Sequence, residues 1–172
     1  MKNLKFITLA IAILGFTSIS FAQTNPTVSA TAAAGANIIA PIAITKNVDM
    51  NFGNIAPSAT VAGTVTLATN GTRTNSGASL PAVEGTVAAA QFTVTGEGDS
   101  AFTISMPADN AIKLVGAGTD MNLTGFTNDA GGATSALITG TKVINVGATL
   151  HVGQSQAAGA YTANFAVTVN YN

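Results

Sequence analysis

The chain has 172 residues, of which 47% are hydrophobic and only 8% are charged, and its formal net charge is −1. Its six Lys and Arg residues are too few for a basic surface that binds nucleic acid, and its apolar content is too high for an intrinsically disordered chain. Cysteine is absent, which excludes disulfides, thiolate metal sites and cysteine catalysis. The composition therefore predicts one folded domain with no nucleic-acid partner.

The first residues have the pattern of a secretory leader. Two lysines precede an almost unbroken apolar run over residues 6–16, and small residues at Ser20 and Ala22 fit a signal-peptidase site. The run is too short for a transmembrane helix, so we expect no transmembrane segment after cleavage. The pattern predicts that residues 1–22 are removed and that the mature chain begins at Gln23. The expected destination is the periplasm, the outer surface or the extracellular space.

Apolar and polar residues alternate along most of the remaining chain. This is the period of a β-strand with one buried and one solvated face. Clusters of Gly, Asn, Asp and Ser separate the alternating segments and are typical of turns. The strands are expected within residues 42–52, 61–67, 88–95, 102–106, 112–114, 121–123, 144–152 and 161–171. We therefore expect an all-β protein with a single domain at residues 23–172, an antiparallel β-sandwich of about eight to ten strands, immunoglobulin-like or pilin-like.

The segment before these strands also alternates. Val28 and Ile38 flank alanines at every second position, with mostly polar residues between them. We expect this segment to form a weakly anchored first strand, because each alanine buries little apolar area. The alternative is that it adds a strand to a neighbouring subunit. Alanine side chains would make such an exchange reversible.

Residues that could carry chemistry are few. The single histidine, His151, lies between two apolar residues of an alternating strand, so its side chain is expected to face solvent. Single acidic residues in Gly-rich turns fall short of the six to eight oxygens that calcium requires. Those acidic residues are Glu97, Asp99, Asp120 and Asp129. Serines and threonines lack a neighbouring base. We expect no enzyme activity, no cofactor and no metal site.

Eight stretches, taken in order, resemble a secreted bacterial β-sandwich family classified as domain of unknown function 4402. They lie at residues 39–46, 50–55, 63–67, 71–73, 90–96, 146–150, 158–162 and 167–171. The resemblance covers nearly the whole mature chain and implies the fold. It implies no activity, since the family has none assigned.

The end of the chain also resembles spore coat U-type proteins and chaperone–usher fimbrial subunits. Those proteins end in a Gly-x-Tyr turn and a long strand with a penultimate aromatic residue, and here Gly159, Tyr161 and Tyr171 match. The resemblance implies an assembly signature at these residues and a periplasmic chaperone that grips the last strand. The chain differs from both groups in lacking their cysteines.

Two functions stay open. One is a structural subunit of the cell envelope, fimbria-like or part of a surface layer, that contacts copies of itself or other subunits through strand edges. The other is a monomeric extracellular module that binds a glycan or a protein with the loops at one end of the sandwich. Only 6% of residues are aromatic and Trp is absent, so platforms for sugar rings are scarce. This favours the structural function.

Overall fold

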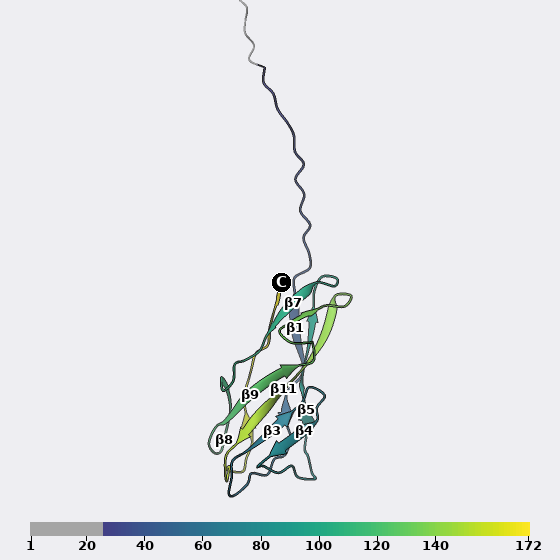
Figure 1. Ribbon diagram of the computed structural model, residues 1–172. Coiled ribbons are helices and arrows are strands. Elements are labelled where there is room, and N and C mark those ends of the chain that lie inside the picture. Colours follow the sequence, from purple (N-terminus) through teal and green to yellow (C-terminus); the bar gives the residue numbers. More distant parts are fainter. Residues whose placement is uncertain (1–25) are drawn as a thin grey trace, which may run out of the picture. The chain divides into compact units, whose positions relative to one another are not determined.

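The computed structural model describes residues 26–172, and within them it contains only strands, turns and loops (Figure 1). The predicted leader, residues 1–22, lies outside the described residues. No helix in the described range is long and apolar enough to cross a membrane. The strands are β1 (Ala43–Val48), β2 (Asn51–Phe52), β3 (Gly63–Leu67), β4 (Arg73–Ser76), β5 (Val87–Ala88), β6 (Ala90–Thr95), β7 (Ala101–Ser105), β8 (Ile112–Gly116), β9 (Met121–Asn128), β10 (Thr134–Ala136), β11 (Thr141–Val152), β12 (Tyr161–Thr162) and β13 (Thr168–Tyr171).

The strands form two main antiparallel sheets. The larger sheet has the order β1-β6-β11-β9-β8-β12, and β3 joins it by pairing with β11 and β4. The smaller sheet has the order β10-β7-β13, and β2 and β5 form a separate ribbon. The long strand β11 pairs with β6 through residues 141–146 and with β3 through residues 148–152, while β9 pairs along its other edge. In Figure 1 β11 accordingly lies at the middle of the larger sheet.

The core lies between the sheets and has two parts. In one part, Phe102 and Ile104 of the smaller sheet pack with residues of β6 and β11 such as Ile144. The other part joins residues of β3, β9 and β11 with Phe52. Alternate residues point inward in β6 and β7, for example, as the sequence predicts. The all-β antiparallel sandwich is thus confirmed.

The strand boundaries differ from the prediction in several short elements. The described chain has more strands than the eight to ten expected, because β2, β5 and β12 have only two residues each. Strand β4 includes Asn75 and Ser76, which the sequence assigns to a turn. Pairing with β3 holds these polar residues in a strand, with Val65 opposite Asn75.

The prediction of a first strand between Val28 and Ile38 is wrong. Residues 26–41 are exposed and belong to no strand, and the side chains of Val28 and Ile38 are each 91% exposed. Residues 38–172 form one compact unit, and residues 26–37 do not belong to it. The physical reason is the small size of alanine. Burying a row of alanine side chains gains little hydrophobic free energy, and this gain does not offset the conformational entropy lost when the backbone is ordered.

The predicted last strand, residues 161–171, is interrupted. Its first part is β12, which pairs with β8 of the larger sheet, and its last part is β13, which pairs with β7 of the smaller sheet. Residues 163–167 cross between the two sheets and lie in no strand. The predicted inward face is kept from Phe165 onward, because Phe165 is half-buried and Val167 and Val169 are buried, whereas Ala163, which the alternation also places inward, is exposed.

Candidate functional site

A long depression runs along one side of the sandwich, where no strand closes the gap between the sheets. It consists of two cavities of about 480 and 580 Å³ that share lining residues, among them Phe52 and Tyr161. Residues 46–57 form one border and residues 156–165 form the other. We call this depression the edge groove.

The floor of the edge groove is the hydrophobic core itself. Phe92 of the first core part and Leu123 and Leu150 of the second line the two cavities. Half-buried apolar side chains add to the lining, with Met50 on one border and Phe165 on the other, beside polar residues such as Asn51 and Asn164. An occupant of the groove would therefore contact the core directly, which is the kind of apolar contact that stabilises association.

Both borders of the edge groove carry backbone groups without a strand partner. Strand β1 pairs only with β6, so its other edge is free. Residues 163–167 take part in none of the backbone hydrogen bonds found among residues 26–172. Unpaired N–H and C=O groups at a sheet edge can accept a further strand. The groove thus combines an apolar floor with two open edges.

A buried arginine holds the chain in place at the border of the edge groove, at the end of β2. Arg73 of β4 is 3% exposed in its side chain, and its Nη1 donates hydrogen bonds to the carbonyl oxygens of Phe52 (2.6 Å) and Asn54 (3.0 Å). Its Nη2 has no hydrogen-bond partner and lies 3.7 Å from an oxygen of Glu84. The sequence gives no signal for this contact, since the carbonyl groups that Arg73 binds belong to β2 and to the chain just after it, about twenty residues earlier.

Gly159 and Tyr161, two residues of the predicted assembly signature, shape the other border. Gly159 has a φ of +151°, and a Cβ there would lie 3.1 Å from that of Ala117, so the position suits glycine. The Tyr161 hydroxyl donates to the carbonyl oxygen of Ala157 (2.8 Å) and accepts from Nε2 of Gln156 (2.9 Å). Together these residues fold the chain before β12 against the end of β8.

Tyr171, the third signature residue, lies on the other sheet. Its hydroxyl donates to the carbonyl oxygen of Ala40 (2.9 Å) and accepts from the backbone N–H of Glu97 (2.7 Å). The Glu97 carboxylate accepts a hydrogen bond from the N–H of Ala40 (3.1 Å). The structure thus does not join Tyr171 to Gly159 and Tyr161 in one cluster. It places Tyr171 where the exposed N-terminal residues enter the compact unit.

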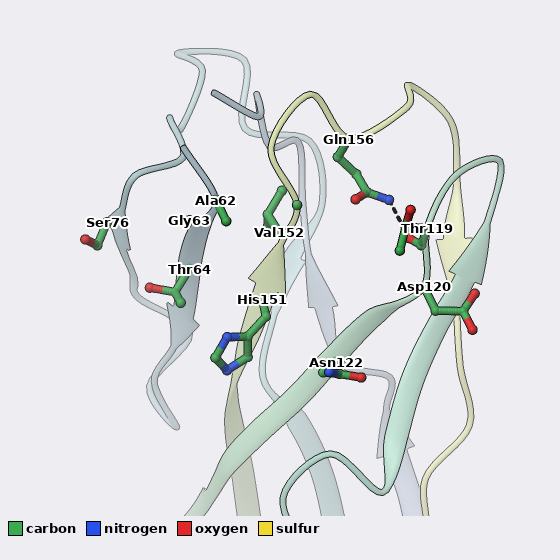
Figure 2. A pocket seen from close by; sticks show the side chains of 11 residues that line it. Ala62, Gly63, Thr64, Ser76, Thr119, Asp120, Asn122, His151, Val152 and Gln156 are labelled. Carbon is green, nitrogen blue, oxygen red and sulfur yellow. Dashed lines mark hydrogen bonds between the residues drawn. The ribbon is translucent and has the colours of Figure 1, made fainter. Parts of the chain in front are cut away.

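A separate polar pocket of about 370 Å³ lies at one end of the sandwich (Figure 2). His151 lines it from β11 and Asn122 from β9, and the predicted solvent-facing position of His151 is confirmed. Nε2 of His151 lies 2.8 Å from the hydroxyl oxygen of Thr124. In the view of Figure 2, the Asp120 carboxylate points away from the imidazole, so these two groups do not form a pair.

The other acidic loop residues accept hydrogen bonds from the protein's own amides. Asp99 binds the N–H of Thr139 (2.8 Å), and Asp129 binds the N–H and the side-chain amide of Asn145. Among residues 26–172 no group of three or more His, Asp or Glu side chains is arranged to hold a metal ion. These carboxylates therefore act as loop supports in this structure.

The family model described as Domain of unknown function (DUF4402) matches residues 42–171, which is most of the chain. The chain belongs to this family. The predicted membership is thereby confirmed, and the matched range includes all thirteen strands of the described region together with both borders of the edge groove. No curated protein matches the chain. No solved structure matches it either.

Proposed function

We propose that the chain is an exported, non-enzymatic structural protein of the cell envelope, a fimbria-like or surface-layer subunit that assembles with copies of itself or with other envelope subunits. The observation that carries this proposal is the edge groove, an apolar floor between two unpaired backbone edges. An open edge of this kind favours the addition of a strand from another chain.

Export rests on the leader pattern of residues 1–22. The destination we propose is the periplasm, the outer surface or the extracellular space. A periplasmic chaperone is a suitable transient partner, because residues 163–167 and β13 offer a backbone edge that needs cover before assembly. In this proposal the residues of the assembly signature have structural roles. Gly159 and Tyr161 shape one border of the edge groove, and Tyr171 binds Ala40, where the N-terminal segment joins the compact unit.

The polar pocket supports a second candidate function, a monomeric binding module. Hydroxyl, amide and imidazole groups meet there from several strands and loops, which suits a glycan or a polar peptide. The pocket residues that offer such groups are Thr64, Ser76, Asn122, His151 and Gln156. The proposal of a structural subunit takes precedence, because this pocket offers no aromatic side chain on which a sugar ring could stack.

Cell fractionation and intact-mass measurement test the export step. We expect the protein in the periplasmic or surface fraction, with a mass that corresponds to a chain beginning at Gln23. A full-length chain in the cytoplasm would contradict the proposal. Sedimentation of the purified mature chain tests assembly. Concentration-dependent growth in mass is expected for a subunit, whereas a monomer that binds glycans on an array would favour the binding module.

A further inference from the structure

The chain carries two motifs for the attachment of a glycan to an asparagine. The motif is Asn-x-Ser/Thr with any residue except proline in the middle. It occurs at residues 70–72 and 122–124, whereas the proline within residues 25–27 excludes a third match. We propose that Asn70 is glycosylated in the exported chain and that Asn122 is not. The inference goes beyond assembly, and it rests on the export that the proposed function includes.

The first motif forms the tip of the hairpin between β3 and β4, which lie side by side in Figure 1. The N–H of Gly71 donates to the carbonyl oxygen of Ala68 (2.9 Å), and Gly71 has a φ of +83°. A hairpin loop of this kind ends in a left-handed residue, a conformation that glycine favours. Asn70 is exposed, and a Cβ on Gly71 would meet no heavy atom within 4 Å. The acceptor asparagine therefore lies at an open turn.

The side-chain amide of Asn70 is held so that its nitrogen stays free. Its Oδ1 accepts one hydrogen bond from the N–H of Thr72 (3.0 Å) and another from the hydroxyl of Thr72 (2.8 Å). Only the oxygen of a side-chain amide can accept these hydrogen bonds. The nitrogen Nδ2 makes none of the hydrogen bonds found among residues 26–172. The hydroxyl residue of the motif thus binds the amide that the motif marks.

This arrangement suits the transfer of a glycan to the amide nitrogen. The donor is an oligosaccharide joined through its C1 atom to a polyprenyl diphosphate, and the catalyst is an oligosaccharyltransferase. Nδ2 of Asn70 forms a bond to C1, the bond between C1 and the diphosphate oxygen breaks, and the polyprenyl diphosphate leaves. One amide proton passes to a base of the transferase. Its loss places negative charge on Oδ1, at which both donors of Thr72 already point, so Thr72 is a positioning residue.

The second motif lies inside the larger sheet. Asn122 belongs to β9, which pairs with β8 on one side and with β11 on the other. The middle residue of the motif, Leu123, is 2% exposed and belongs to the core. The hydroxyl of Thr124 lies 2.8 Å from Nε2 of His151, so this hydroxyl contacts the imidazole. A transferase would have to remove β9 from the sheet to reach Asn122, at the cost of strand pairing and buried apolar area.

Peptide mapping of the chain from the envelope fraction of its native cell tests the site. Trypsin cleaves after lysine and arginine, so the two motifs fall on different peptides, residues 47–73 and residues 114–142. Peptide 47–73 should carry the added mass of a glycan on Asn70. Peptide 114–142 should have the mass of its unmodified sequence. Fragmentation of peptide 47–73 assigns the glycan to the asparagine.

Substitutions within the motifs identify the role of each residue. Asn70→Gln and Thr72→Val should each abolish the added mass, whereas Thr72→Ser keeps a hydroxyl and should retain it. Asn122→Gln is the matched control and should leave the modification of peptide 47–73 unchanged. Asn70 and Thr72 are exposed at the hairpin tip, so denaturant melts of these variants should show a folded chain. Loss of the glycan in a folded variant is then a loss of acceptor function.

The possible results distinguish this inference from the export on which it rests. An exported mature chain with an unmodified peptide 47–73 would overturn the inference and leave export in place. A glycan on Asn122 in place of Asn70 would show that the fold does not select the acceptor, and it would also overturn the inference. An unmodified full-length chain in the cytoplasm would contradict export and glycosylation together.

Discussion

The hydroxyl of Tyr171 donates a hydrogen bond of 2.9 Å to the carbonyl oxygen of Ala40, which lies 131 residues earlier in the chain. The penultimate residue thereby holds the point at which the exposed N-terminal segment joins the compact unit. The same hydroxyl accepts from the N–H of Glu97, whose carboxylate binds the N–H of Ala40. The N–H and the C=O group of Ala40 are thus held by two side chains, Glu97 from a loop and Tyr171 from β13.

Tyr171→Phe should release this anchor and leave the sandwich folded. The aromatic ring remains, so the loss is limited to two hydrogen bonds at an exposed site, about 0.5–1.5 kcal/mol in the free energy of unfolding. Denaturant melts measure that loss. Hydrogen exchange should accelerate at Ala40 and Glu97, the amides that the network engages. Unchanged exchange at both amides would show that the hydroxyl does not anchor the segment.

Two phenylalanines distinguish the closed core from the open groove. Phe102 is fully buried, so Phe102→Ala should lower the free energy of unfolding by about 3–5 kcal/mol. Phe165 is half-buried, with ring centroids 6.3 Å from Phe92 and 5.3 Å from Phe126. Phe165→Ala should therefore cost less, about 1.5–3 kcal/mol. Equal losses in denaturant melts would mean that the groove is closed in solution.

Alternation in the sequence predicted which face of each strand is buried. Phe92, Val94 and Ile144 point inward in the structure, as their parity requires. The same alternation did not predict where a segment lacks a neighbouring strand. Residues 28–38 and 163–167 alternate as well as the core strands do, yet neither segment is paired. Periodicity reports the two faces of a strand and carries no information about the backbone hydrogen bonds at its edges.

The edge groove was beyond sequence reasoning for the same reason. No strand of the described chain lies between β1 and residues 163–167, and an absent neighbour leaves no residue pattern. The role of Arg73 has no sequence signal either, because its partners are carbonyl groups, which every residue has. The signature residues Gly159, Tyr161 and Tyr171 were found from their positions near the chain end, but their separation onto two sheets became visible only in the structure.

His151→Ala should change the free energy of unfolding by no more than about 0.5 kcal/mol. The side chain is exposed, and water can replace its contact with the hydroxyl of Thr124. Val152→Ala, at the buried neighbouring position, is the control and should destabilise by more, because it removes methyl groups from the core. A large loss for His151→Ala would mean that the imidazole has a structural role in the polar pocket.

Arg73→Lys should destabilise the chain although the charge is kept. The guanidinium donates from Nη1 to two carbonyl oxygens that follow one another on the groove border, at Phe52 and Asn54, while its Nη2 lies toward Glu84. A lysine has a single ammonium group on a flexible chain and does not reproduce this planar arrangement. We expect a loss of about 1.5–3 kcal/mol in the free energy of unfolding, measured in denaturant melts, since buried hydrogen bonds from a charged donor are lost.

Glu84→Gln is the matched control. Its side chain is 68% exposed, so that substitution should cost no more than about 1 kcal/mol. If Arg73→Lys is as stable as the parent, the border is held by the pairing of β2 with β5 and not by the arginine.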